Sequence, residues 1–156
     1  MQQPHEFKLA NLNLFQAIVE QAPDAIIFAD RDGAIRVWNR GAEKVFGYSA
    51  AEVLGASLDV IIPERLRRAH WEGFRKAVET GQTRHGDRVL TTRSVNKKGD
   101  KLYVDLSFGL VKDEAGAVAG ALAISRDCTA RYLSDNALRA RVLELEKKLE
   151  VAPKQP

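Results

Sequence analysis

The spacing of hydrophobic residues changes along the chain, and each change predicts a different element. Near the N-terminus, helical spacing relates four apolar residues: Leu14, Phe15, Ile18 and Val19. A helix is therefore expected over residues 12–21, ending before Pro23. Two short runs follow, residues 24–30 and 34–38, separated by a turn signal at residues 31–33. The pattern predicts a flanking helix and then a β-hairpin.

Capping residues divide the next segment into short helices. Asn39 is a strong N-cap for a helix over residues 40–46, and Ser49 with Glu52 has the spacing of a capping box for residues 50–54. A longer helix is predicted over residues 64–80. Its expected buried stripe consists of Leu66, Ala69, Gly73, Phe74, Ala77 and Val78.

The second half of the chain has the alternating pattern of strands. Three strands are predicted, over residues 87–95, 101–111 and 117–126, with turns between them. One face of the middle strand carries Leu102, Val104, Leu106, Phe108 and Leu110. Together these elements predict an α+β domain built on one antiparallel sheet, with helices on one face.

After Cys128 the pattern becomes helical again. Leu138, Val142, Leu145 and Leu149 follow one another at intervals of 4, 3 and 4 residues, the a/d spacing of a coiled coil. Because a helix packed on its own domain usually has a wider apolar stripe, we expect a homodimer through this helix; packing on its own domain is the alternative. The expected divisions are a frayed N-terminus (1–11), one folded domain (12–128), the helix (129–151) and a tail (152–156).

Composition narrows the class of protein without naming a function. The chain has 156 residues, 45% of them hydrophobic, and a net charge of +3, which fits one globular domain. There is no membrane-length apolar run and no secretory signal, so a cytoplasmic protein is expected. The basic residues lack the interleaved aromatics of a nucleic-acid platform, and no nucleic-acid partner is expected.

An ordered set of short motifs resembles the PAS sensor domain over about residues 12–130. The motifs are Ala22-Pro-Asp-Ala-Ile-Ile27, Asp30-Arg-Asp-Gly-Ala-Ile35, Trp38-Asn-Arg-Gly-Ala-Glu43, Phe46-Gly-Tyr48, Glu52-Val-Leu-Gly55, Ile62-Pro63, Lys97-Lys-Gly-Asp100 and Ser125-Arg-Asp127. The resemblance implies a PAS fold, in which a five-stranded antiparallel sheet and short helices enclose a small-molecule pocket. It also implies a bacterial-type signal-transduction module, whose C-terminal helix carries the signal toward a downstream signalling protein.

Catalytic motifs are absent, and no enzyme is expected. The sequence has no G-x-S-x-G, H-E-x-x-H, P-loop or G-x-G-x-x-G motif. Flavin photoreceptors of the PAS superfamily need a cysteine in the central helical segment, and residues 58–70 contain none. Blue-light adduct chemistry is therefore excluded, and the single Cys128 is expected to be a small apolar residue.

The resemblance makes haem b the leading cofactor candidate. Some PAS domains bind haem through a histidine on or near the long helix, where His70 lies, and a neutral imidazole is a good iron ligand. Gly73 is expected to leave room for a bulky group, with Phe74 on the ring and Leu106 and Phe108 covering its opposite face.

The chain offers a second histidine and a basic residue to the same cofactor. His85 is the alternative ligand, since rhizobial oxygen-sensing haem domains carry Asp-Pro-His at about this place, where this chain has Thr-Arg-His. Arg88 is a candidate contact for a haem propionate or a bound gas.

Other cofactor states stay open at the level of sequence. Flavin is the second candidate, with Trp38 as a contact, although Trp38-Asn39 is also the common spelling in PAS domains without a cofactor. A cofactor-free interaction or dimerisation module is the main alternative function. A haem protein with peroxidase-like activity is a further one.

Overall fold

The computed structural model describes residues 11–84, 86 and 88–151. Its elements run in the order α1 (Asn11–Gln21), β1 (Ala25–Asp30), β2 (Ile35–Trp38), α2 (Arg40–Phe46), α3 (Ala50–Val53), the 3-10 helix η1 (Leu58–Val60), α4 (Glu64–Thr80), β3 (Leu90–Val95), β4 (Lys101–Lys112), β5 (Val118–Asp127) and α5 (Thr129–Val151). The predicted fold class is confirmed. The expectations for residues 1–10 and 152–156 lie outside the described residues.

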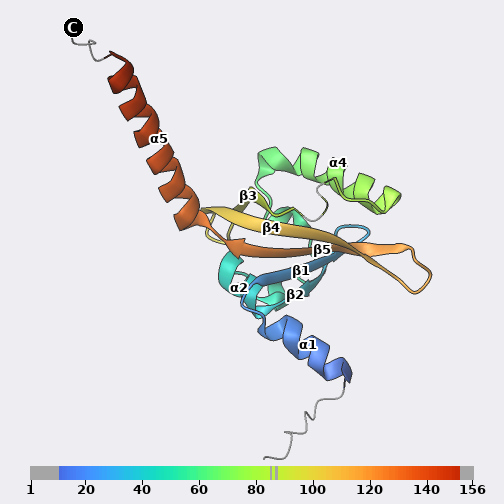
Figure 1. The fold of residues 1–156 in the computed structure, drawn as a ribbon. Helices are drawn as coiled ribbons and strands as arrows, with labels where there is room; N and C mark the ends of the chain where they lie inside the picture. Colours follow the sequence, from blue (N-terminus) through green and yellow to red (C-terminus); the bar gives the residue numbers. More distant parts are fainter. Residues whose placement is uncertain (1–10, 85, 87, 152–156) are drawn as a thin grey trace, which may run out of the picture.

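Five antiparallel strands form one sheet in the order β2-β1-β5-β4-β3 (Figure 1). The hairpin β1–β2 and the meander β3–β4–β5 meet where β1 pairs with β5, placing Ile27 opposite Ala123 and Ala29 opposite Ala121. The short helices and α4 lie on one side of this sheet. Since side chains alternate along a strand, every second residue points toward the helices.

Two clusters of buried side chains fill the space between the sheet and the helices. The larger consists of Ala25, Ile27, Ile35, Trp38, Ala42, Phe46, Val53, Leu102 and Val104. The smaller consists of Ala29, Phe74 and Ala121. Leu102 and Val104 belong to the alternating face predicted for the middle strand, which confirms its orientation toward the core.

Asn39 caps α2 as predicted, and it also connects elements that are distant in sequence. Its side chain is fully buried, and Oδ1 accepts hydrogen bonds from the Ala42 amide at 2.9 Å and the Ile26 amide at 2.8 Å. Its Nδ2 donates to the carbonyl oxygens of Val19 at 2.8 Å and Asp24 at 3.0 Å. This residue therefore ties the end of α1 and the start of β1 to α2.

The buried stripe predicted for α4 is wrong at two positions. Ala69 and Gly73 are exposed, and a Cβ on Gly73 would meet nothing within 4 Å, so this glycine makes no room inside the molecule. The helix instead turns Leu66, His70 and Trp71 toward the interior, together with Phe74 and Ala77. Large amphipathic rings pack inward here because they fill more of the space above the sheet than alanine or glycine can.

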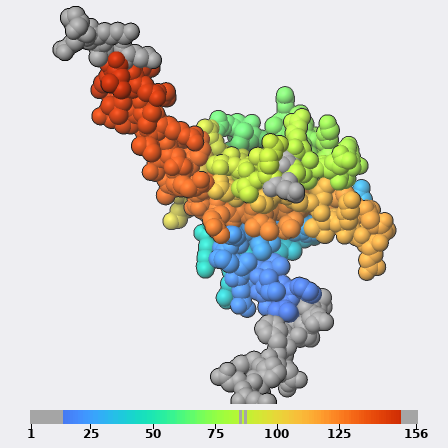
Figure 2. All heavy atoms as spheres, in the orientation of Figure 1, coloured from blue at the N-terminus to red at the C-terminus, as the bar shows by residue number. Residues whose placement is uncertain are grey.

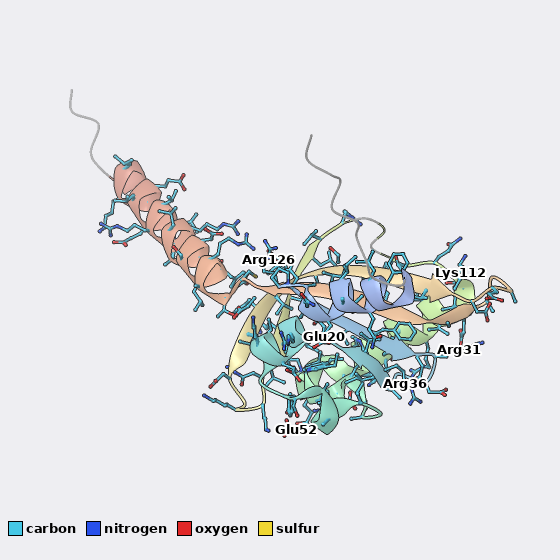
Figure 3. All side chains as sticks on the ribbon, turned by 90° about the horizontal axis from the view of Figure 1, so that it is seen from below. Glu20, Arg31, Arg36, Glu52, Lys112 and Arg126 are labelled. Atoms are coloured by element: carbon cyan, nitrogen blue, oxygen red, sulfur yellow. The ribbon has the colours of Figure 1, made fainter. Side chains whose placement is uncertain are left out.

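Helix α5 leaves the sheet as a single projecting rod (Figure 2). Every side chain from Leu133 to Leu149 is exposed, so the helix does not pack on its own domain. Figure 3 shows its side chains projecting on all sides with no other element beside them. None of the described helices is long and apolar enough to cross a membrane.

The base of α5 is held by contacts with β4. The rings of Tyr103 and Tyr132 stack at 3.8 Å between centroids, with 19° between their planes. Arg131 donates to Asp105 at 2.5 Å, and the Thr129 hydroxyl accepts from the Tyr103 amide at 2.9 Å. The first turn of α5 is therefore fixed to the sheet, and the remainder is not.

Candidate functional site

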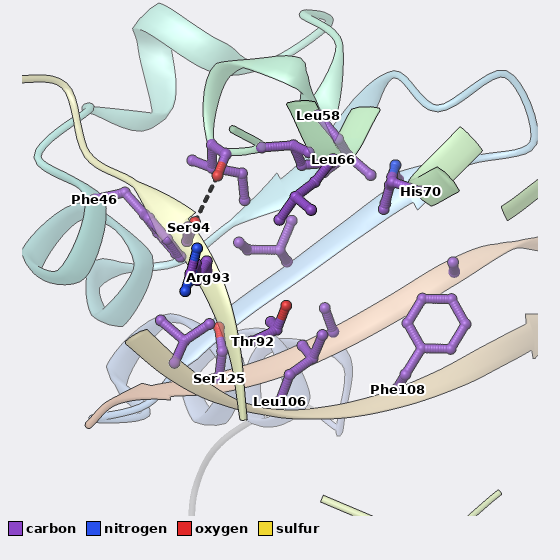
Figure 4. Close-up of a pocket in the computed structure, with 17 residues that line it drawn as sticks. Phe46, Leu58, Leu66, His70, Thr92, Arg93, Ser94, Leu106, Phe108 and Ser125 are labelled. Atoms are coloured by element: carbon purple, nitrogen blue, oxygen red, sulfur yellow. Dashed lines mark hydrogen bonds between the residues drawn. The ribbon is translucent and has the colours of Figure 1, made fainter. Parts of the chain in front are cut away.

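A cavity of about 190 Å³ lies between the sheet and the layer formed by η1 and α4 (Figure 4). It is lined by Ile27, Ala29, Phe46, Leu58, Ile61, Ile62, Leu66, His70, Thr92, Arg93, Ser94, Val104, Leu106, Phe108, Ala121, Ala123 and Ser125. The wall is mostly apolar, which is typical of small-molecule and cofactor sites.

Small side chains on the central strands make room for this cavity. Ala29 faces Ala121 across the β1–β5 pair, and Ala123 faces Ile27. Three of these four neighbouring positions on the floor of the cavity are alanines, so the sheet cannot fill the gap beneath α4. The register of β1 against β5 thus places the cavity at the centre of the sheet.

Hydroxyl groups form one side of the cavity. Thr92 and Ser94 belong to β3, and Ser125 belongs to β5. The Ser94 hydroxyl donates to the carbonyl oxygen of Ile61 at 2.5 Å, joining β3 to the segment after η1. These polar contributors were not anticipated from the sequence, because serine and threonine on a strand carry no distinctive pattern.

His70 stands on the wall formed by α4, on the far side of the cavity from Leu106 and Phe108 (Figure 4). Its Nδ1 atom is buried and has no hydrogen-bond partner among the described residues. Burial lowers the pKa of the imidazole, and the negative charge of Asp59 partly opposes this effect. The neutral ring therefore predominates near pH 7, with polar capacity left for a bound molecule.

The other predicted site residues are divided between the cavity, the core and the surface. Leu106 and Phe108 line the cavity as expected. Phe74 is buried behind it, packed with Phe108 in the smaller cluster. Trp38 is a core residue outside the lining set, and its Nε1 donates to the carbonyl oxygen of Tyr48 at 3.0 Å.

Arg88 is not among the residues that line this cavity. Arg88 is exposed and precedes β3, which begins at Leu90 rather than at residue 87. His85 lies outside the described residues. Over residues 11–84, 86 and 88–151, no group of three or more His, Cys, Asp or Glu side chains is placed to hold a metal ion.

His70 is a donor of the type that binds haem iron, but the cavity is small for a porphyrin. A buried, neutral imidazole without a competing partner is a suitable axial ligand. The volume of 190 Å³ is below the roughly 300–1,000 Å³ of most ligand sites. A porphyrin is larger than this space, so its binding requires a wider cavity.

Comparison with known proteins places these features in a family. A family model described as the PAS fold matches residues 19–133. The oxygen sensor protein DosP of Escherichia coli (strain K12) is 28% identical over 132 residues, which are 85% of this chain and 16% of DosP. The sensor protein FixL of Bradyrhizobium diazoefficiens is 34% identical over 55 residues, 35% of this chain and 11% of FixL.

Solved structures show the same architecture. A PAS domain from Colwellia psychrerythraea superimposes with a TM-score of 0.67 at 25% identity, covering 78% of this chain and 99% of that one. An RNA-binding light-oxygen-voltage receptor superimposes with a TM-score of 0.68 at 20% identity, covering 97% of this chain and 42% of the receptor. At that identity the second likeness concerns the fold alone.

Proposed function

Because the chain belongs to the PAS-fold family, we propose that it binds a small ligand or cofactor in the cavity beneath α4 and transmits the bound state through α5 in a homodimer. A sensory rather than catalytic role agrees with the absence of catalytic motifs from the sequence. The chain spans about one-sixth of the length of the curated relative DosP. A downstream signalling partner is therefore a part of this proposal. A cytoplasmic location stays a prediction.

The proposed cofactor is haem b, with His70 as the axial ligand. The unpartnered Nδ1 on the cavity wall carries this assignment, and the similarity to two proteins named as sensors, one of them an oxygen sensor, supports it. When bound, haem supplies an iron centre that takes up diatomic gases or changes oxidation state. The chain supplies the imidazole, while Leu106 and Phe108 exclude water from the opposite wall.

A second candidate is a smaller apolar molecule with one polar group. The volume of about 190 Å³ and the hydroxyls of Thr92, Ser94 and Ser125 favour it, because such a molecule fits without movement of α4. A hydroxyl or carboxyl group on the ligand would reach these side chains while its apolar part contacts the alanines of the floor. A cofactor-free dimerisation module is the remaining alternative.

Absorption spectroscopy of the protein purified from cells separates these functions. A Soret band indicates haem, and flavin bands indicate flavin. A protein that shows no Soret band after incubation with hemin and removal of the unbound hemin overturns the haem assignment. His70→Ala is expected to abolish or shift the Soret band while the circular dichroism of the fold is retained. His85→Ala is the matched control, and loss of haem in that variant alone would refute the ligand assignment.

The homodimer is supported by the exposed seam of α5. Leu138, Val142, Leu145 and Leu149 are all exposed in a single chain, and only two heptads are present, too few for stability alone. When Leu145 is assigned to a d position and Val142 to an a position, Arg141 takes a g position and Glu146 the following e position. A parallel pair would place Arg141 beside Glu146 of the partner subunit, which favours that orientation.

Strand β3 supplies a route from the cavity to α5. Thr92, Arg93 and Ser94 line the cavity. Thr91 and Arg93 also contact residues that hold α5. Thr91 donates to Asp105 at 2.6 Å, and the guanidinium of Arg93 lies 5.8 Å from the centre of the Tyr103 ring.

Those two partners of β3 contact α5 directly. Asp105 accepts from Arg131, and Tyr103 stacks on Tyr132. A ligand that binds one position of β3 more tightly would therefore bias the base of α5.

A further inference from the structure

The indole of Trp71 occupies the space between three elements. Its Nε1 donates to Asp59 Oδ1 in η1 at 2.8 Å. Its six-membered ring covers Gly33 in the β1–β2 turn so closely that a Cβ there would lie 2.3 Å and 2.4 Å from two ring carbons. Trp71 thus connects α4 to η1 and to the hairpin turn. We call this arrangement of Trp71, Asp59 and Gly33 the indole clamp.

The same indole contacts the imidazole on the cavity wall. The rings of His70 and Trp71 meet edge to face at 4.9 Å and 77°, and the rings of Trp71 and Phe74 do so at 5.3 Å and 72°. A metal-ligating histidine is usually oriented by a hydrogen bond from its second ring nitrogen. Neither ring nitrogen of His70 makes a hydrogen bond with a described residue, so packing against Trp71 and Phe74 is what holds the ring plane.

Arg67 on α4 makes further polar contacts with η1 and the segment that follows it. The side chain of Arg67 donates to the carbonyl oxygens of Asp59 and Ile62, at 3.1 Å and 3.2 Å. No side-chain hydrogen bond or ion pair among the described residues joins α4 to a strand, and the contact with the sheet is apolar. The polar contacts between α4 and its surroundings are therefore concentrated on η1 and the segment that follows it.

We propose that Trp71 is a positioning residue for His70, and that the indole clamp sets the orientation of the imidazole. This inference rests on the proposed role of His70 as a ligand. Weakening the clamp should let the imidazole rotate away from the orientation that α4 and the indole give it. A haem held by His70 would then be bound less tightly, although the fold of the sheet is intact.

The experiment measures two quantities in the full chain: the NMR ring signals of His70 without hemin, and the affinity for hemin. In the hemin-free protein, Trp71→Leu should broaden the NMR ring signals of His70, in addition to the shift that loss of the indole ring current causes. Trp71→Phe should broaden them less. In titrations with hemin, Trp71→Leu should weaken binding at least tenfold. Trp38→Phe is the matched control, because it also removes an indole N–H donor from a buried contact, and it should leave the His70 signals in place.

Two variants of Asp59 test the hydrogen bond by itself. Well above pH 6.5, where His70 is neutral with or without the Asp59 charge, Asp59→Asn keeps an acceptor oxygen for the indole and should resemble the wild type. Asp59→Ala should resemble Trp71→Phe. Unchanged line widths of the His70 signals in Trp71→Leu would overturn the proposal. Equal broadening of these signals in Asp59→Asn and Asp59→Ala would also overturn it. If the wild type fails to bind hemin, the haem assignment fails, and the NMR comparison still decides whether Trp71 positions His70.

Discussion

The six-membered ring of Trp71 lies directly over the α-carbon of Gly33, where any larger residue would collide with it. Gly33 and Gly55 have nearly the same backbone dihedral, with φ of +82° and +83°, yet a Cβ on Gly55 would meet nothing within 4 Å. The two glycines therefore separate the cost of a left-handed backbone from the cost of displacing the indole.

Gly33→Ala is expected to destabilise the protein more than Gly55→Ala. Both substitutions place a Cβ in the left-handed region, at about 1–2 kcal/mol. Gly33→Ala also forces the indole to move, adding about 1–3 kcal/mol by overpacking. Chemical denaturation monitored by circular dichroism gives both free energies of unfolding. Equal losses would mean that the indole yields without resistance.

Asn39→Ala is expected to cost about 3 kcal/mol, more than the roughly 1 kcal/mol of an ordinary helix cap. The larger value is expected because the change leaves the buried amides of Ile26 and Ala42 without an acceptor. Asn39→Asp keeps the acceptor oxygen but loses the donor to Val19 and Asp24, so it should also destabilise. If Asn39→Ala lowered the free energy of unfolding by only about 1 kcal/mol, capping of α2 alone would account for the loss.

Leu145→Asp should convert the dimer to a monomer, since a carboxylate in the apolar seam costs several kcal/mol (about 2–5). Leu143→Asp is the matched control, because Leu143 lies on the same helix, is also exposed, and is off the seam. Light scattering coupled to gel filtration measures the mass of each variant. The same mass for Leu145→Asp and the wild type would exclude α5 as the interface.

Arg141→Glu should weaken a parallel dimer, because it places a carboxylate beside Glu146 of the partner subunit. Two such contacts per dimer give an expected loss of about 1–2 kcal/mol. Combining Arg141→Glu with Glu146→Arg should restore the dissociation constant measured by analytical ultracentrifugation. Failure of the double variant to recover would argue against the parallel register.

His70 should make the stability of the hemin-free protein depend on pH. Burial lowers the pKa of His70 below its usual 6.5, so the unfolded chain binds a proton at a higher pH than the folded one. The contribution of the neutral ring is complete above pH 6.5 and is lost as the pH falls toward the folded-state pKa. His70→Leu should remove this dependence, and identical pH profiles for the two proteins would contradict the prediction.

Local sequence patterns were sufficient to predict the order of helices and strands and the family. The alternating residues of β4 set which of its faces is apolar, and Asn39 marks the start of α2 by its chemistry. The intervals between Leu138, Val142, Leu145 and Leu149 describe a seam whether or not a partner is present. These features depend on residues within one or two turns or strand repeats, so a linear pattern contains them.

The tertiary structure decided which side chains surround the cavity. The sequence pattern turned Ala69 and Gly73 inward and overlooked Trp71, because these residues lie at the two edges of a single apolar stripe and periodicity does not set where that stripe ends. The choice among them depends on Gly33 and Asp59, which are distant in sequence and give the indole a place to pack. The alanines beneath the cavity meet only through the β1–β5 register. Periodicity sets the faces of an element, whereas packing between distant elements determines which face is buried and what space remains.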